Sequence, residues 1–282
     1  MGAENIENRV AICVLTHNRR EDLRKTLKRI RELENLFTEC LVLDNGSSDG
    51  TTDMIGVLAE TFPKLRNFRS EENLGVSKGR NFLWERTEAD LILALDDDII
   101  INSRDFKEIL EEYKSSNLPC IVSPQIIEDD TGRILNDNKV FWKGSTLYEA
   151  CFLLPREIIE KVGMFDPALS VAAEGQDYAI RVRRAGFKIH RIDSATVIHV
   201  QRERSNIVNK ERRLEWLRSF SYVYFKNLSI TSATLKISRL FLSMSRHDLV
   251  DFGFRHIFSL LKLARKGAVE GMKVKSGRDA PD

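Results

Sequence analysis

The sequence predicts an α/β protein with a mostly parallel, Rossmann-like sheet flanked by helices and followed by a C-terminal helical extension. Two observations carry this prediction: apolar strand-like runs alternate with helical patterns through the first half of the chain, and the pattern from Lys210 onward is helical. A strand–helix–strand order makes successive strands parallel, with the helices covering the sheet. Ligands of such sheets bind at the carboxyl ends of the strands.

The elements of the first half follow from apolar spacing and from boundary residues. Leu23, Leu27 and Ile30 share one face of the first helix, Asp49 is placed to cap the second, and Pro63 ends it. The predicted order is strand 10–15, helix 21–35, strand 41–43, helix 49–61, strand 65–68, helix 77–87 and strand 91–95.

Beyond Pro119 the pattern is less regular. The sequence there predicts a strand over 121–125, a hairpin over 129–143 around Asp130-Thr131-Gly132, helices over 156–162 and 176–185, short strands over 188–192 and 196–200, and helices from 210 with breaks near Asn227 and Arg246.

Three consecutive aspartates, Asp96-Asp97-Asp98, directly follow the apolar run 91–95. Carboxylates clustered at one sheet edge are unfavourable unless a cation or strong donors compensate them. Hard oxygen ligands on a short corner suit Mg²⁺ or Mn²⁺, which also accept phosphate oxygens. The alternative is a solvated acidic turn that leads into the helix near Ser103. The position after a buried strand favours a metal–diphosphate site.

Polar loops follow the other three strands of the first half as well. Each is ordinary turn chemistry when taken alone. Because they follow successive parallel strands, we expect them to meet at one rim of the sheet. They are Thr16-His17-Asn18-Arg19, the segment 44–51 with the sequence Asp-Asn-Gly-Ser-Ser-Asp-Gly-Thr, and Asn73-Leu74-Gly75.

Composition and cysteine usage are those of an ordinary soluble globular protein, with 42% apolar and 30% charged residues. The net charge of +2 conceals a basic C-terminal stretch, Lys236 to Lys275. The four cysteines form no CxxC pair, so we expect buried reduced thiols rather than a disulfide framework or a zinc knuckle. The N-terminus has no signal-peptide core and no apolar stretch is long enough to cross a bilayer, so a cytoplasmic protein is expected.

Taken in order, these elements resemble the inverting glycosyltransferases of family 2, which have the GT-A fold. The resemblance runs from about Arg9 to His199 and includes the aspartate corner as the equivalent of the family's DxD motif. It rests on the segments 16–19, 44–51, 73–81, 96–98, 150–156 and 162–166.

The resemblance implies a role for each matching residue. Asp44 would accept a hydrogen bond from the base or ribose, which favours a UDP- or dTDP-sugar, and Arg80 would pair with the diphosphate. Mn²⁺ or Mg²⁺ would be held by Asp98, Asp96 and His199. The nucleotide-sugar-binding residues would be Thr16, Asn18, Arg19, Asp44, Asn73, Gly75, Arg80, Asp96 and Asp97.

The catalytic base is the position where this chain departs from the family. The family's base is typically the Asp of a Glu-Asp pair just before a helix, whereas this segment is Glu174-Gly175-Gln176-Asp177. We expect Asp177 to be the base, with Glu174 on the same helix face as its partner or substitute. The alternative is that both carboxylates only face the positive end of the helix dipole.

The expected function is therefore metal-dependent, inverting transfer of a sugar from a nucleotide-diphosphate sugar to a hydroxyl acceptor in polysaccharide or glycolipid assembly. Because of Gly175, a second function stays open: the chain would be a regulatory subunit that binds a nucleotide sugar without transferring it. A nucleotidyltransferase is the least favoured class, because the loop after the first strand has no glycine-rich phosphate motif.

The expected domains are a catalytic domain, 1–205, and a basic helical region, 206–282. Within the first, residues 1–125 form the nucleotide-sugar half and 126–205 the acceptor half. The basic amphipathic pattern over 254–273 could lie on the inner face of the cell membrane and meet a glycan or lipid-linked acceptor. Equally, it could pack on the catalytic domain or on a second copy in a homodimer. Nucleic acid is not an expected partner.

Overall fold

The computed structural model describes residues 8–136, 147–170, 172–200, 210–251 and 255–277, and the side chains of 210–214 and 241–260 lie outside that description. The chain divides into two units. The first comprises residues 1–168 and 178–203, and the second comprises residues 169–177 and 204–282. The domain boundary expected near 205 falls on residues that the structure does not describe.

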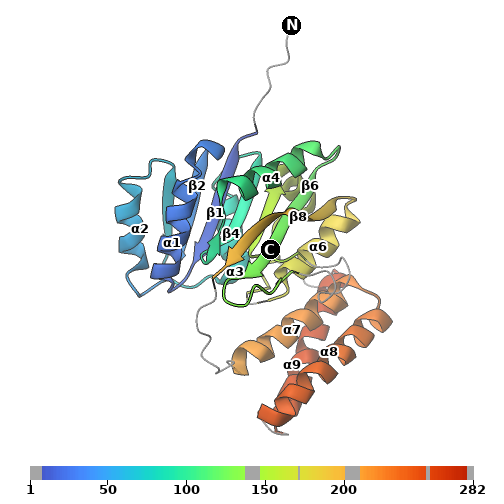
Figure 1. Ribbon diagram of the computed structural model, residues 1–282. Coiled ribbons are helices and arrows are strands. Elements are labelled where there is room, and N and C mark those ends of the chain that lie inside the picture. The colour runs from blue at the N-terminus through green and yellow to red at the C-terminus, as the bar shows by residue number, and fades with distance from the viewer. Residues whose placement is uncertain (1–7, 137–146, 171, 201–209, 252–254, 278–282) are drawn as a thin grey trace. The chain divides into compact units, whose positions relative to one another are not determined.

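The first unit is built on an eight-stranded sheet (Figure 1). The strand order is β3 (Leu65–Ser70), β2 (Glu39–Asn45), β1 (Val10–Thr16), β4 (Leu91–Asp96), β7 (Cys151–Pro155), β6 (Cys120–Glu128), β8 (Lys188–His199) and β5 (Ile99–Ile100).

The first four strands in this order are parallel, as the strand–helix alternation predicts. Strand β7 inserts antiparallel between β4 and β6 and was not predicted as a strand. The two short strands predicted over 188–200 are one strand, β8, whose pairing with β6 shifts register between Pro124 and Gln125. Such an irregularity breaks the apolar pattern without ending the strand.

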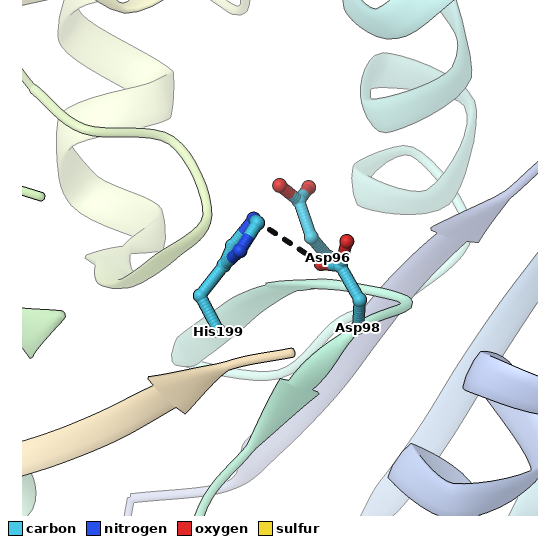
Figure 2. A group of neighbouring side chains, drawn as sticks. All are labelled: Asp96, Asp98 and His199. Atoms are coloured by element: carbon cyan, nitrogen blue, oxygen red, sulfur yellow. Dashed lines mark ion pairs between the residues drawn. The ribbon is translucent and has the colours of Figure 1, made fainter. Parts of the chain in front are cut away.

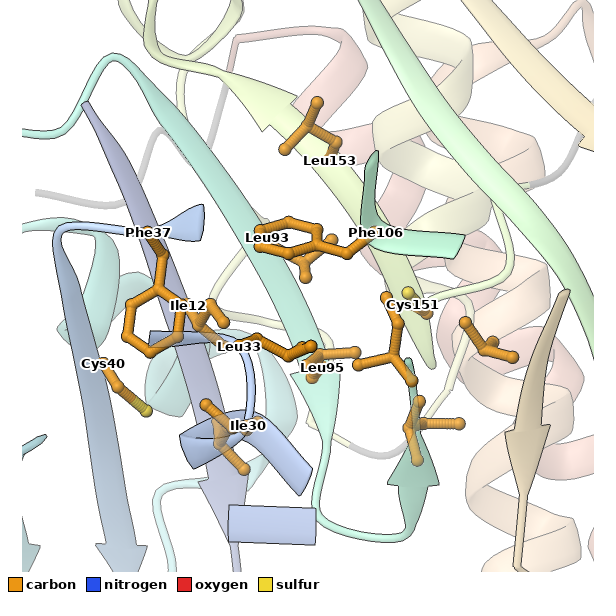
Figure 3. Close-up of a cluster of buried hydrophobic side chains, with 14 of the residues drawn as sticks. Ile12, Ile30, Leu33, Phe37, Cys40, Leu93, Leu95, Phe106, Cys151 and Leu153 are labelled. Carbon is orange, nitrogen blue, oxygen red and sulfur yellow. The ribbon is translucent and has the colours of Figure 1, made fainter. Parts of the chain in front are cut away.

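Helices cover both faces of the sheet, because successive strand residues face opposite sides. One core cluster contains Ile12 and Leu93, with buried residues of α1 (Arg20–Arg31), α2 (Thr51–Ala59) and α4 (Ser103–Ser115) (Figure 3). The other contains Cys13 and Ile92, with residues of α3 (Gly75–Trp84), α5 (Arg156–Val162) and α6 (Glu174–Arg184). All four cysteines are buried free thiols, as expected.

Helix boundaries differ from the predictions by a few residues. Helix α1 ends at Arg31, and a 3₁₀ turn (Glu34–Leu36) follows it. Gly50 rather than Asp49 holds the N-cap position of α2, and the Asp49 carboxylate accepts from the backbone N–H groups of Thr51 and Arg20. In the region of the hairpin expected over 129–143, the structure has an isolated antiparallel bridge between Ile127 and Ile134, and residues 137–143 lie outside the described residues.

The second unit contains α7 (Lys210–Asn227), α8 (Ile230–Asp251) and α9 (Arg255–Lys275). The break expected near Asn227 is confirmed, whereas the one near Arg246 is wrong because α8 continues to Asp251. Helices α7 and α9 pack closely through glycine: a Cβ atom at Gly271 would overlap the carbonyl oxygen of Tyr222. Of the helices in the described part of the chain, none is both long and apolar enough to span a bilayer.

Candidate functional site

Three asparagines tie together the loops that follow β1, β2 and β3. Asn18, in the left-handed region at φ 53°, accepts from the backbone N–H of Ser48 at 2.8 Å. Asn45 donates to the side-chain oxygen of Asn73 at 3.0 Å and accepts from the backbone N–H of Leu74 at 2.9 Å. The predicted convergence of these loops at one rim is therefore present.

Asp97, the middle aspartate of the corner, accepts hydrogen bonds from two threonines of the first unit. Its Oδ2 accepts a 2.6 Å hydrogen bond from the hydroxyl of Thr16, and its carbonyl oxygen accepts one of 2.9 Å from the hydroxyl of Thr26. Both Thr16 and Asp97 are buried. These hydrogen bonds fix the shape of the corner, and the contact of Thr16 and Asp97 with a nucleotide sugar stays a prediction.

Arg80 is buried beside the aspartate corner. It is only 2% exposed, and its guanidinium donates to Oδ1 of Asp96 at 2.6 Å and to the carbonyl oxygen of Glu149 at 2.9 Å. The ring of Phe152 lies 5.7 Å from the guanidinium carbon. In this position Arg80 orients the carboxylate of Asp96, and its contact with a diphosphate stays a prediction.

Asp96, Asp98 and His199, the three predicted metal ligands, lie together in a cluster that could hold a metal ion (Figure 2). Each offers one ligand atom, and these atoms all lie within 4.8 Å of one another. Asp96 is the last residue of β4, Asp98 lies in the turn between β4 and β5, and His199 is the last residue of β8. Nε2 of His199 lies 3.5 Å from Oδ1 of Asp98, and Arg19 forms an ion pair with the other oxygen of Asp98.

The corner concentrates negative charge in a buried setting. Burial is the main cause that raises the pKa of Asp97 to about 7, and the charges of Asp98 and Asp96 add to it, against the hydrogen bond from Thr16 and the charge of Arg19. Burial and then the charge of Asp96 raise the pKa of Asp98, although His199 and Arg19 oppose them. A further cation would stabilise the ionised form of these groups.

The donor set fits a divalent cation. Oδ1 of Asp98 and Nδ1 of His199 are buried polar atoms to which the described residues supply no hydrogen-bond partner. Buried polar atoms of this kind are rare in folded proteins and call for a partner. Two carboxylates and an imidazole suit Mn²⁺ well and Mg²⁺ through its preference for oxygen.

Asp44 lies at the end of β2 and is 1% exposed. Its Oδ1 accepts from the backbone N–H of Ser47 at 2.9 Å, and its Oδ2 accepts from the hydroxyl of Thr52. The carboxylate therefore shapes the loop after β2, and its contact with a base or ribose stays a prediction. Asn18 and Asn73 are exposed on the linked loops, and Gly75 begins α3 at φ 77°.

Glu174 and Asp177 both belong to the second unit. They lie in the first turn of α6, three residues apart. Glu174 is 6% exposed, whereas Asp177 is 0% exposed and its Oδ1 lies 3.0 Å from the ammonium of Lys226 and 2.8 Å from the amide nitrogen of Asn227. Asp177 thus has no exposed surface at which an acceptor hydroxyl could approach it, and its role as the base stays a prediction.

The deciding comparison is with protein-family models, where the model described as glycosyl transferase family 2 matches residues 11–163. This match spans more than half of the chain. The chain belongs to glycosyl transferase family 2. The matched segment includes the linked loops and the aspartate corner but ends before Glu174 and His199.

Two curated relatives match shorter segments of this family 2 chain. An uncharacterized protein of Haemophilus influenzae is 29% identical over 97 residues, which cover 34% of this chain and 52% of that protein. The uncharacterized glycosyltransferase YfnE of Bacillus subtilis is 29% identical over 93 residues, which cover 33% of this chain and 24% of that protein. The match thus spans about half of one relative and a quarter of the other.

Two solved structures share the fold, each with a TM-score of 0.63. One is the mannosyltransferase PcManGT from Pyrobaculum calidifontis in complex with GDP-Man and Mn²⁺, which is 16% identical, with 96% of this chain and 89% of that one covered. The other is GalNAc-T7 with UDP, GalNAc and Mn²⁺, which is 14% identical, with 78% and 48% covered. The predicted GT-A fold is confirmed.

Sequence reasoning did not find the residues that bond to Asp177 and to the backbone of Asp97. Lys226 and Asn227 belong to no motif and lie about 50 residues from Asp177, so neither spacing nor composition identifies them. Thr26 was also not identified, because it belongs to an amphipathic helix and to no motif. Its position as a polar residue on the apolar face formed by Leu23, Leu27 and Ile30 is the signal that could have identified Thr26.

Proposed function

We propose that this family 2 protein is a metal-dependent, inverting glycosyltransferase that moves a sugar from a nucleotide-diphosphate sugar to a hydroxyl acceptor. The cluster of Asp96, Asp98 and His199 at the rim of the sheet is the observation that carries the proposal. Among donors we favour UDP- and dTDP-sugars, because a carboxylate such as Asp44 can accept the imide N–H of either base. Polysaccharide or glycolipid assembly is the pathway class that such a transfer serves.

Asp96, Asp98 and His199 would hold Mn²⁺ or Mg²⁺. A bound ion would supply positive charge to stabilise the leaving diphosphate. We assign Glu174 as the base, because it retains accessible surface while Asp177 is enclosed. The acceptor oxygen forms a bond to the anomeric carbon from the side opposite the leaving group, the bond to the diphosphate breaks, and the acceptor proton passes to Glu174.

Two measurements on purified protein test this proposal. The first is the melting temperature with UDP-, dTDP- and GDP-sugars, each with and without Mn²⁺, since a ligand of the folded form raises it. The second is sugar transfer and donor hydrolysis by the wild type, by Glu174→Gln and by the exposed control Glu160→Gln. We expect at least a hundredfold loss of rate in Glu174→Gln with unchanged donor binding. Full activity of that variant would remove the base assignment.

A regulatory subunit that binds the donor without transferring the sugar is the second candidate, and Gly175 at the usual base position favours it. The same two measurements separate the two functions. Metal-dependent donor binding without hydrolysis or transfer, over a panel of hydroxyl acceptors, would support the subunit.

We further propose that helix α9 makes peripheral contact with the inner face of the cell membrane and so brings a cytoplasmic enzyme to a lipid-linked acceptor. Leu261, Val269 and Met272 are exposed apolar residues at helical spacing. Exposed cations lie beside them on the same helix: Lys262, Arg265, Lys266 and Lys273. Cations flanking an apolar stripe are what an anionic lipid surface attracts.

Co-sedimentation with vesicles tests the membrane contact. We expect binding to vesicles containing phosphatidylglycerol and not to pure phosphatidylcholine, with a several-fold loss in the double variant Lys262→Glu/Lys266→Glu. The control Lys25→Glu/Lys28→Glu makes the same charge change on exposed residues of α1 and should bind like the wild type. Equal binding of both double variants, or a concentration-dependent dimer in place of vesicle binding, would contradict the proposal.

A further inference from the structure

Within the second unit, Asp177 joins the first turn of α6 to the last turn of α7. Its Oδ1 receives both the ammonium of Lys226 at 3.0 Å and the side-chain N–H of Asn227 at 2.8 Å. Asn227 also donates to the carbonyl oxygen of Val223 at 3.0 Å, which fixes the orientation of its amide. All of these groups are largely or fully buried.

The pair of charges is a strong constraint on the local structure. Removal of the cation alone leaves a buried, uncompensated carboxylate and is strongly destabilising. Removal of both partners costs much less stability. Lys226 is also favourably placed at the C-terminal end of its helix, where the dipole attracts a cation. The contact therefore fixes where the first turn of α6 can lie.

We infer that Lys226 and Asn227 are positioning residues for the transfer reaction, acting through Asp177 on Glu174. This inference rests on the proposed function, because it takes Glu174 as the base. Glu174 and Asp177 are three residues apart on one helix, so both lie on the same face and move together. The segment 169–177 is grouped with the C-terminal helices rather than with the sheet, which agrees with an anchor in α7.

The role follows from the glycine at position 175. Glycine adds backbone freedom to the turn that carries Glu174. An external anchor restores the fixed geometry that proton transfer requires, since a small misplacement of a catalytic group lowers the rate strongly. Lys226 and Asn227 supply that anchor from α7.

The test uses Lys226→Met, which removes the charge at similar size, Lys226→Arg, which keeps it, and Arg239→Met, which removes an exposed cation from α8. We expect Lys226→Met to lower kcat at least tenfold while the affinity for nucleotide sugar with Mn²⁺ changes less than twofold. Lys226→Arg should restore most of the rate, and Arg239→Met should match the wild type. An unchanged kcat in folded Lys226→Met would overturn the inference.

The double variant Lys226→Met/Asp177→Asn guards against a single variant that fails to fold, because it leaves no unpaired buried charge. We expect it to fold and to keep the low kcat. A double variant with wild-type kcat, or one that fails to fold where Arg239→Met folds, would show that the contact serves folding alone and would equally overturn the inference.

Failure of this inference is distinguishable from failure of the proposed function. If Glu174→Gln is inactive while Lys226→Met is fully active, only the positioning role is lost. If the wild type transfers no sugar, or if Glu174→Gln retains full activity, the proposed function or its base assignment fails first.

Discussion

Oγ1 of Thr16 donates a 2.6 Å hydrogen bond to Oδ2 of Asp97 and so joins the end of β1 to the aspartate corner. The bond links residues 81 positions apart, both of them buried. It explains why a small hydroxyl-bearing residue stands where β1 leaves the sheet: the carboxylate behind it needs a donor that reaches it without filling the rim.

We expect Thr16→Val to destabilise the protein by about 1–3 kcal/mol, because the isosteric side chain leaves a buried carboxylate without its donor. Urea unfolding followed by circular dichroism measures this change. Thr16→Ser keeps the hydroxyl and should therefore have nearly the unfolding free energy of the wild type. Equal stability of Thr16→Val and wild type would show that the hydrogen bond contributes nothing to the folded state.

Removal of Arg80 should damage both the fold and the metal site. Arg80→Met leaves Asp96 and the carbonyl oxygen of Glu149 without their shared donor, and we expect a loss of roughly 2 kcal/mol in unfolding free energy. We also expect weaker Mn²⁺ binding, measured by titration calorimetry, because Asp96 is no longer oriented. Arg66→Met, which removes a half-exposed arginine paired with Glu39 on β2, is the control and should bind Mn²⁺ like the wild type.

Mn²⁺ should stabilise the wild type in a way that depends on the cluster of Asp96, Asp98 and His199. At a hundredfold excess over its dissociation constant a ligand adds about 2.7 kcal/mol, which appears as a higher melting temperature that EDTA reverses. The effect should be lost in Asp98→Asn and His199→Ala.

The matched control for the metal experiment is His190→Ala. Nδ1 of His190 lies 2.9 Å from a carboxylate oxygen of Glu112, and His190 is not part of the cluster. This variant should keep the full response to Mn²⁺. A response that survives in Asp98→Asn and His199→Ala alike would place the metal elsewhere.

Two glycine-to-alanine substitutions should have opposite effects on stability. Gly271→Ala places a methyl group against the carbonyl oxygen of Tyr222, so α9 must move away from α7, and overpacking of this kind costs about 1–3 kcal/mol. Gly56 lies within α2 with open space around its Cβ position, so Gly56→Ala should stabilise by roughly 0.5–1 kcal/mol. Thermal unfolding of both variants checks the pair, and a neutral Gly271→Ala would contradict the close packing of α7 and α9.

Local patterns were enough to predict the parallel half of the sheet. Apolar strands that alternate with helices predict that β1 to β4 are parallel, because each helix carries the chain back across the sheet, whereas the order β3-β2-β1-β4 came from the structure. The antiparallel strand β7 escaped prediction, since its five buried residues have no alternation and could equally belong to a helix.

For the candidate site as well, the sequence predicted some features and the structure alone supplied others. Asp96, Asp98 and His199 could be proposed as metal ligands from motif and resemblance, and the structure brings them together. The places of Arg80 and Asp177 could not be foreseen. The sequence shows which side chains are charged. Contacts between distant segments decide which of these side chains are buried and which partners they have.

The amino-acid sequence by itself determined the α/β class, the convergence of polar loops at one rim and the chemistry of the aspartate corner, because each follows from periodicity or from neighbouring residues. Tertiary structure alone decided that Arg80 serves Asp96 and that Lys226 and Asn227 hold Asp177. The physical reason is that burial and pairing set the energy of a charged group, and both arise only when segments far apart in the chain pack together.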